Sequence, residues 1–410
     1  MQTVKLKLEE KMNILVINCG SSSLKYQLID MQDERVLCKG LVERIGIDGS
    51  RIKHEVEGKD KEIIEKPLSN HKQALDLVIS SITDPKIGAV KSIDEINAVG
   101  HRVVHGGEDF AESVIITDEV MKSIEANVEL APLHNPPNII GINACKELMP
   151  GVPQVAAFDT AFHHTIPPVN YVYAIPYEYY KKYKIRRYGF HGTSHEYVGK
   201  RAAEIVGKPF EQCNFITCHL GNGSSVTCIR HGKSIDTTMG FTPLEGLVMG
   251  TRCGDLDPAI VTYLMEKENM SIEEMNTMMN KKSGVLGISG ISSDFRDLED
   301  AAAEGNERAS LALDSFENQV KKAIGAYLTE IDSCDGIIFT AGIGENSPNN
   351  RLSIMRGFQN RGVMLDMWRN NTRGKETTIS TRDSAIRVMV IPTNEELMIA
   401  RDTLRLVEEA

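Results

Sequence analysis

The sequence predicts an α/β protein made of two related domains, and three observations carry that prediction. The chain has 410 residues, which is more than the roughly 150 residues of one typical domain. A pattern of strand, glycine and serine turn, and strand occurs twice, as ILVINCGSSSLKYQLID at 14–30 and FITCHLGNGSSVTCIRHG at 215–232. Strand-like runs also alternate with amphipathic helical windows, such as 272–279 and 301–328, which is typical of layered α/β folds.

Composition and charge argue against several classes of protein. Apolar residues make up 41% of the chain and charged residues 25%, which is close to ordinary globular usage. The 46 Lys and Arg residues are outnumbered by 57 Asp and Glu residues, giving a net charge of −11. Such a charge disfavours nucleic acid and anionic membranes as partners. An anionic substrate would therefore need a local basic pocket.

The N-terminal residues and the cysteines point to a cytoplasmic protein. Residues 1–11, MQTVKLKLEEK, are too charged for a signal peptide, so we expect them to be an extension that precedes the first strand. No run approaches the roughly 20 apolar residues of a membrane span. The eight cysteines include no C-x-x-C pair, so we expect reduced thiols rather than disulfides or a zinc ribbon.

Two further segments have recognisable patterns. Segment 51–70 is so rich in charge that we expect an exposed hairpin or loop. Segment 336–347, GIIFTAGIGENS, is interpreted as a strand, a glycine turn and a helix. Such an arrangement can cradle a phosphate or nucleoside, although similar turns also close many ordinary strand-to-helix corners.

Histidines are concentrated in turns rich in glycine and proline. Nine of the eleven fall between His101 and His231, and loops held by a scaffold are where functional side chains gather. The four-residue spacings of His101 with His105 and of His191 with His195 invite a zinc interpretation. Neither spacing carries the glutamate of a hydrolytic H-E-x-x-H helix, so zinc chemistry is disfavoured.

Two arginines and three acidic residues are further candidates. Arg102 and Arg252 lie in glycine-rich turns, where a guanidinium can bind a carboxylate or phosphate in a bidentate fork. The alternative for each is an ordinary surface ion pair. Asp159 follows the strand-like run VPQVAAF, at the strand end where α/β proteins place reactive groups, or else it closes an Asx turn. Asp294 and Glu395 complete the set.

The C-terminal glutamates offer one structural alternative. Glu396 lies three residues after Thr393, so the two could form a capping box at the start of the last helix. That role would leave Glu395 free to face a metal ion.

The motifs together resemble those of the acetokinase family, within the superfamily of sugar kinases, Hsp70 and actin. The resemblance runs from Met12 to the C-terminus. The matching motifs are NCGSSSLKYQ (18–27), GHRVVHGG (100–107), LAPLHNPPN (130–138), FDTAFH (158–163), YGFHGTSH (188–195), HLGNGSS (219–225), MGFTPLEGLVMGTRCGDLDP (239–258), TAGIGENS (340–347) and PTNEE (392–396). Cys253 stands where a serine is common in the family, which does not put the activity in doubt.

The resemblance implies a fold, a reaction and an assembly. The expected fold is a pair of duplicated ribonuclease H-like domains, as in actin-like ATPases, with an interdomain cleft. The expected domains are 12–160 plus 395–410, and 161–394 for nucleotide binding and dimerisation. The implied reaction is reversible transfer of the ATP γ-phosphoryl group to acetate, giving acetyl phosphate and ADP, with Mg²⁺ or Mn²⁺. Family members are homodimers.

Site residues are carried over from the family motifs one by one. The catalytic residues implied are Arg102, Asp159, His191 and Arg252. Acetate would contact Arg102, Val104, Leu133, His134, Phe190 and Pro243, and the metal would be held by Asn18 and Glu395. Phosphate and nucleotide contacts are implied for Ser21, Lys25, His219, Leu220, Gly221, Asn222, Gly223, Asp294, Phe295, Arg296, Gly342, Ile343, Gly344, Glu345 and Asn346.

Charge supports a carboxylate acceptor, and two alternatives stay open. A carboxylic acid with a pKa of roughly 4 to 5 is already ionised at pH 7, so acetate needs charge cancellation rather than a base. A propionate kinase of the same family is the nearest alternative, because one methylene changes pocket energy by only about 1 to 3 kcal/mol. An ATP-switch protein of the superfamily would have no use for an acceptor clamp, so it should keep slow ATP hydrolysis in Arg102→Ala.

Overall fold

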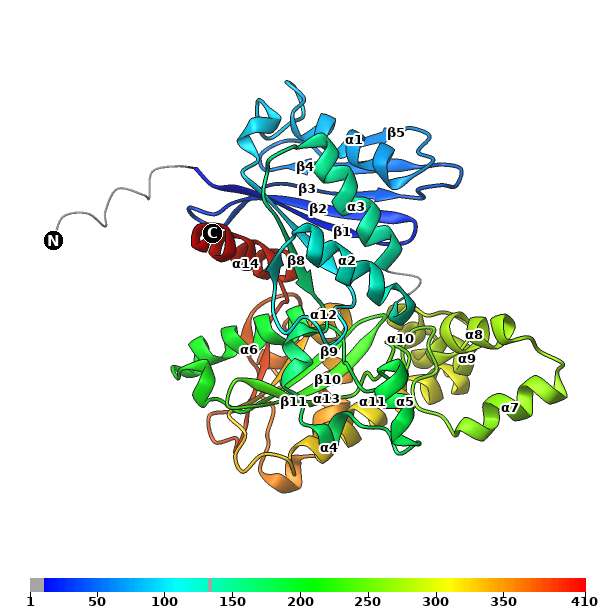
Figure 1. Cartoon of the computed structure of the whole chain (residues 1–410). Helices are drawn as coiled ribbons and strands as arrows, with labels where there is room; N and C mark the ends of the chain where they lie inside the picture. Colours follow the sequence, from blue (N-terminus) through cyan, green and yellow to red (C-terminus); the bar gives the residue numbers. More distant parts are fainter. Residues whose placement is uncertain (1–10, 132–134) are drawn as a thin grey trace. The chain divides into compact units, whose positions relative to one another are not determined.

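A computed structural model describes residues 11–131 and 135–410 (Figure 1). The chain divides into two compact units. Unit 1 comprises the residues up to Ala161 together with Asn394–Ala410, and unit 2 comprises Phe162–Thr393. Each unit contains one mixed β-sheet with helices on its faces.

Unit 1 is built on an eight-stranded sheet. Its spatial order is β5-β4-β3-β2-β1-β6-β8-β7. β1, β6 and β8 are parallel, and the other neighbours pair antiparallel. The strands are β1 (Asn13–Cys19), β2 (Ser23–Asp30), β3 (Arg35–Glu43), β4 (Arg51–Val56), β5 (Glu62–Glu65), β6 (Ala98–Val103), β7 (Val114–Ile115) and β8 (Gln154–Phe158).

Alternation along the central strands of unit 1 buries both faces of the sheet. Leu15 and Ile17 of β1 pack in a core cluster with α1 and α3, whereas Ile14 and Val16 pack in another with α14. Gly100 on β6 allows α14 to approach closely, because a Cβ there would lie 2.6 Å from side-chain atoms of the helix. The helices are α1 (His71–Ile82), η1 (Ile93–Glu95), α2 (Asp118–Ala126), η2 (Asn127–Leu130), α3 (Asn135–Leu148) and α14 (Glu395–Glu409).

Unit 2 is built on a six-stranded sheet. Its order is β11-β10-β9-β12-β14-β13, with β9, β12 and β14 parallel. One face packs against the long helix α11 and the other against α6 (Figure 1). The strands are β9 (Phe215–Leu220), β10 (Ser224–Arg230), β11 (Lys233–Thr237), β12 (Gly336–Thr340), β13 (Thr377–Thr378) and β14 (Arg387–Val390).

The helices of unit 2 are more numerous than those of unit 1. They are η3 (Ala161–Thr165), which starts at the unit boundary, α4 (Pro168–Tyr171), α5 (Tyr177–Tyr183), α6 (Gly192–Val206), η4 (Phe210–Gln212), α7 (Pro258–Lys267), α8 (Ile272–Lys281), α9 (Gly284–Ser289), α10 (Phe295–Ala303), α11 (Glu307–Tyr327), α12 (Ala341–Asn346), α13 (Pro348–Arg356), η5 (Gln359–Arg361) and η6 (Arg369–Asn371). In the part of the chain that the structure describes, no helix is long and apolar enough to cross a membrane.

The two sheets repeat one another, which confirms the duplicated α/β fold. β1 and β2 form a hairpin with a turn at 20–22, and β9 and β10 form a hairpin with a turn at 221–223. In each sheet a third antiparallel strand follows the hairpin, as β3 or β11. Two parallel strands lie on the other side of the first strand, as β6 and β8 or β12 and β14. The repeated sequence pattern therefore marks the first hairpin of each domain.

Of three predictions about local secondary structure, one is confirmed and two are wrong. The charged segment 51–70 forms the β4–β5 hairpin, as expected. The single helix expected over 301–328 is wrong, because α10 ends at Ala303 and Asn306 caps α11 after Gly305 turns with φ +91°. The capping box at Thr393 is also wrong. Asn394 caps α14 instead, with its side chain accepting from the Leu397 backbone N–H.

Candidate active site

In unit 1 the candidate polar residues meet at the carboxyl ends of parallel strands. Arg102 is the penultimate residue of β6, and Asp159 directly follows β8, the adjacent parallel strand. The Arg102 Nη2 atom lies 2.8 Å from the Asp159 Oδ2 atom in an ion pair. Arg102 Nη1 donates to the Asn18 Oδ1 atom at 3.4 Å, and Arg102 Nε lies 4.0 Å from the Glu395 Oε2 atom. Arg102 is thus the centre of this group.

The carboxylates of this group are in electrostatic conflict. Burial raises the pKa of Glu395 to about 7, with Arg102 opposing the shift and Asp159 adding to it. Asp159 and Glu395 raise the pKa of Arg102 despite its burial, which by itself would lower it. Glu396 and Lys25 also act on Glu395, so the group contains three acids and two basic residues, an excess of negative charge that favours a bound cation when the acids are ionised.

The first hairpin and helix α3 brace this end of the sheet. Lys25 on β2 pairs in register with Asn18 on β1. The Asn138 side chain of α3 donates to the Cys19 carbonyl at 2.8 Å and accepts from the Val104 backbone N–H at 3.2 Å. Ser21 lies in the exposed turn of the hairpin. The predicted acetate contacts Leu133 and His134 lie outside the described residues.

In unit 2 the candidate histidines form a stacked pair. His191 precedes α6 with φ +58°, a conformation that is uncommon for a residue other than glycine and is often found at functional sites. The rings of His191 and His219 stack with centroids 4.0 Å apart. The Nδ1 atom of His191 bonds the Ser225 hydroxyl at 2.8 Å, and the Nδ1 atom of His219 bonds the Ser194 hydroxyl at 2.8 Å. A serine therefore orients each ring.

Arg252 differs from Arg102 because it has no carboxylate partner in unit 2, and the structure describes every residue of that unit. Its Nη1 atom donates to the Pro243 carbonyl at 3.0 Å, and burial lowers the pKa of the guanidinium. A Cβ at Gly223 would lie 3.4 Å from both Arg252 Nη1 and His191 Nε2. A cation and an imidazole nitrogen thus converge on the 221–223 turn, an arrangement suited to an anion.

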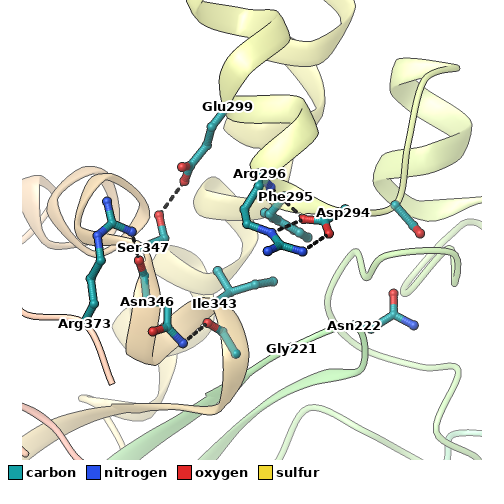
Figure 2. Close-up of a pocket in the computed structure, with 12 residues that line it drawn as sticks. Gly221, Asn222, Asp294, Phe295, Arg296, Glu299, Ile343, Asn346, Ser347 and Arg373 are labelled. Carbon is teal, nitrogen blue, oxygen red and sulfur yellow. Dashed lines mark hydrogen bonds and ion pairs between the residues drawn. The ribbon is translucent and has the colours of Figure 1, made fainter. Parts of the chain in front are cut away.

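A cavity of about 520 Å³ adjoins the same turn (Figure 2). Asp294 caps α10 and pairs with the exposed Arg296 at its edge. Figure 2 also shows Asn346 donating to the Gly342 carbonyl, and Ser347 bonded to Glu299. The lining residues are Gly221, Asn222, Ser293, Asp294, Phe295, Arg296, Glu299, Gly342, Ile343, Asn346, Ser347 and Arg373.

Some predicted nucleotide residues do not line this cavity. Leu220 is buried in the core of unit 2. Glu345 accepts from the backbone N–H of Thr393 at 3.2 Å, and the Gly344 carbonyl accepts from Arg351 at 2.8 Å. The expected glycine turn is itself the short helix α12, entered through Ala341 with φ +62°.

Several lining or orienting residues were not predicted. Arg373 reaches the cavity from a loop with no recognisable motif, so its sequence gives no signal. Ser347 closes the TAGIGENS motif and could have been included. His195 lies in the motif YGFHGTSH, but its bonds to Ser225 and Thr217 depend on strand pairing that the sequence does not reveal.

A nucleotide-sized cavity beside a half-buried guanidinium and a histidine pair, on a duplicated α/β scaffold, defines a nucleotide-dependent phosphotransferase. The sequence model of the Acetokinase family matches residues 13–401. The chain belongs to this family.

Similar proteins agree in sequence and in structure. The chain is 60% identical to an acetate kinase of Alkaliphilus metalliredigens, covering 97% of this chain and all of that protein. A crystal structure of Porphyromonas gingivalis acetate kinase matches with a TM-score of 0.93 and 46% identity, over 97% of this chain and 100% of that one. A propionate kinase structure from Francisella tularensis matches with a TM-score of 0.90 and 43% identity, over 96% and 100%. This chain is accordingly a phosphotransferase with a carboxyl group as acceptor, and its reaction is that of an acetate kinase.

Proposed function

We propose that this protein transfers the γ-phosphoryl group of ATP directly to acetate, through the residues described above, with a divalent cation. The observation that carries the residue assignment is the half-buried guanidinium of Arg252, which has no carboxylate partner in unit 2 and lies beside His191 at the 221–223 turn. The same turn lines the cavity proposed for the nucleotide. The phosphates of the donor and the positive charge of Arg252 would therefore lie at the same turn.

The acceptor chemistry requires charge cancellation. Acetate is ionised at neutral pH, so no base has to remove a proton before it attacks the γ-phosphorus. The two anions repel one another, and Arg102 and Arg252 would offset that repulsion. Asp159 holds Arg102 at 2.8 Å, so its proposed role is to orient the guanidinium rather than to act as a base.

Phosphoryl transfer depends mainly on positioning and on stabilising charge on the equatorial oxygens. We assign that stabilisation to His191, whose Nε2 atom is directed at the turn where Arg252 arrives. Loss of one preorganised donor typically costs about a hundred- to a thousandfold in turnover. We expect His191→Ala to lower kcat by that amount in steady-state assays, with a normal thermal unfolding midpoint.

The charge and donor types of unit 1 fit Mg²⁺. The ion prefers oxygen ligands and is commonly held by one or two carboxylates together with substrate phosphates. Asn18 supplies an amide oxygen and Glu395 a carboxylate, in a group with an excess of acids. Bound Mg²⁺ would neutralise charge on the phosphates. Lys25 and Ser21 are the proposed phosphate contacts from the first hairpin, and His219 and Asn222 those from the second.

Propionate is the alternative acceptor that has support. The F. tularensis structure carries the name of a propionate kinase at 43% identity, and one methylene alters binding by only about 1 to 3 kcal/mol. We propose Val104 in unit 1, and Phe190 and Pro243 in unit 2, as contacts of the acyl group. The other two expected contacts, Leu133 and His134, lie outside the described residues. We favour acetate because the acetate kinase relatives reach 60% identity over 97% of the chain.

We also propose a cytoplasmic homodimer that associates through unit 2. None of the ten residues of α7 is buried, and Ile260 and Tyr263 on that helix are exposed. Val169 and Tyr177, on α4 and α5, are exposed as well. Aromatic side chains such as these two tyrosines are enriched at protein interfaces. Sedimentation equilibrium of the wild type and of Tyr263→Glu should show a dimer and a weakened dimer, respectively.

The test of the proposed function is acyl phosphate formation, trapped as a hydroxamate. The protein would be incubated with ATP and Mg²⁺ and with acetate, propionate, butyrate or glycerol at equal concentrations. We expect the strongest product with acetate, a weaker one with propionate, and no acetate-independent ADP release. Equal or greater product with propionate would move the assignment to that acid. ATP turnover without any acyl phosphate would refute the proposal.

A further inference from the structure

A continuous line of hydrogen bonds runs behind the ring of His191. Its Nδ1 atom bonds the Ser225 hydroxyl at 2.8 Å, and the same hydroxyl bonds the Nε2 atom of His195 at 2.7 Å. The Nδ1 atom of His195 then bonds the Thr217 hydroxyl at 2.7 Å. Ser225, His195 and Thr217 are all fully buried. These three side chains are shielded from bulk water, so water cannot replace their hydrogen-bond partners.

The hydrogens of this line can be placed by counting donors and acceptors. Burial lowers the pKa of His195 well below its usual value, so its ring is neutral and has one N–H. The Thr217 hydroxyl has no other hydrogen-bond partner in unit 2. Its hydrogen must therefore point to His195 Nδ1, because a buried donor left without an acceptor costs about 1 to 3 kcal/mol.

The remaining directions follow from that first one. With Nδ1 of His195 accepting, the single ring hydrogen lies on Nε2 and is donated to the Ser225 oxygen. The Ser225 hydrogen is then free to point to Nδ1 of His191. A neutral His191 that accepts at Nδ1 carries its hydrogen on Nε2, the atom that lies beside the 221–223 turn. The opposite direction would leave the Thr217 hydrogen without an acceptor.

We propose that Thr217, His195 and Ser225 are positioning residues that hold His191 in the Nε2–H tautomer, as a hydrogen-bond donor. The catalytic consequence rests on the proposed function, in which that donor meets the transferring phosphoryl group. The tautomer itself does not depend on it. Held in this form, His191 Nε2 has no lone pair with which to attack phosphorus.

The neighbouring ring of His219 has the opposite arrangement. The Ser194 hydroxyl donates its hydrogen to the Thr393 hydroxyl at 2.8 Å, so it can only accept from Nδ1 of His219. His219 therefore keeps a hydrogen on Nδ1. Two stacked imidazoles that lie 4.0 Å apart are thus expected to differ in protonation pattern, which provides an internal reference in the same spectrum.

The test is long-range ¹H–¹⁵N NMR of the full chain labelled with ¹⁵N-histidine at neutral pH, with His191→Gln to assign the His191 signals. Thr217→Val removes the start of the line. Thr227→Val is the matched control, because Thr227 is an equally buried strand residue whose hydroxyl bonds only the Thr237 hydroxyl in unit 2, at 2.8 Å. Thr237 in turn donates to the Val226 carbonyl at 3.2 Å, so this pair does not reach the histidines. Steady-state kinetics would be measured on the same proteins.

We expect His191 in the wild type and in Thr227→Val to be protonated on Nε2 and bare on Nδ1. Thr217→Val should give a mixture of tautomers and a kcat lower by about ten- to a hundredfold, with a smaller change in the KM for acetate. A wild-type His191 protonated on Nδ1 alone would overturn the proposal, and so would an unchanged tautomer in Thr217→Val. If Thr217→Val does not fold, the wild-type spectrum decides. Absence of acyl phosphate with the expected tautomer would refute the function and leave the tautomer proposal standing.

Discussion

The two hairpins that begin the sheets occupy equivalent places and carry different chemistry. Asn18 is the penultimate residue of β1, and His219 is the penultimate residue of β9. Each of these strands is followed by a three-residue turn. The β1 hairpin lies with Arg102, Asp159 and Glu395, a group rich in acids. The β9 hairpin lies with His191 and Arg252 and has no acid paired to that arginine in unit 2. The repeated scaffold fixes where side chains converge, and the residue types decide which charge gathers there.

The two hairpin regions differ most clearly in their arginines, Arg102 and Arg252. Replacing either arginine should have the largest effect on activity. We expect Arg102→Ala and Arg252→Ala each to lower kcat/KM for acetate by about a thousandfold or more, because each removes a permanent charge from the proposed acceptor site. Coupled assays of ADP release check this loss.

The two arginine variants should differ in their free energy of unfolding. Arg102→Ala leaves the buried Asp159 and the half-buried Glu395 without this cation, which should cost about 3 kcal/mol. Arg252→Ala removes a half-buried charge that has no carboxylate partner in unit 2, so the unfolding free energy should stay within about 1 kcal/mol of wild type. Thermal and urea unfolding would measure both. Equal destabilisation by the two substitutions would break the comparison.

The cavity of unit 2 can be probed with a single methyl group. A Cβ at Gly342 would meet nothing within 4 Å, so Gly342→Ala should fold normally. If the nucleotide lies against this backbone, the new methyl should raise the KM for ATP about tenfold, with little change in the KM for acetate. Gly325 on α11 also has open space for a Cβ, and Gly325→Ala should leave both constants unchanged. If the two variants have the same KM for ATP, the nucleotide does not lie against the Gly342 backbone.

The smallest predicted effect concerns a buried acid that is not among the proposed catalytic residues. Burial raises the pKa of Glu317 on α11 from about 4.5 to about 7, with a hydrogen bond from Ser353 opposing the shift. The folded state therefore holds this proton more tightly than the unfolded state, and stability falls as pH rises from about 4.5 to about 7.

Glu317→Gln should remove that dependence. The variant should be more stable than wild type at pH 8, by about 2 kcal/mol after allowance for partial solvation, and the difference should vanish near pH 4.5. Thermal unfolding across that pH range checks the sign. A wild type that gains stability relative to the variant as pH rises would contradict it.

The sequence predicted those features that depend on local pattern. Alternating apolar residues on either side of a short glycine turn located both hairpins. The strand-like run before Asp159 correctly placed that residue at the carboxyl end of a strand. Gly305 and Asn306 also carry a local signal for the end of one helix and the start of the next, which the prediction of one long helix overlooked.

Features that depend on register and on competition between neighbours could not be predicted. Thr217 and Ser225 look like ordinary buried strand residues, and only the pairing of β9 with β10 brings both of them to His195. Thr393 and Asn394 are both good capping residues, and their order in the chain does not say which one caps α14. Asn394 does so, while Thr393 accepts from Ser194.

The central claim is that the phosphoryl group passes directly from ATP to the acceptor, with His191 donating a hydrogen bond rather than forming a bond to phosphorus. The most direct test is the stereochemistry at phosphorus, measured by ³¹P NMR after transfer from ATP whose γ-phosphoryl group is chiral through its oxygen isotopes. A single in-line transfer predicts inversion of configuration. Retention would reveal a phosphorylated enzyme intermediate and would contradict the account.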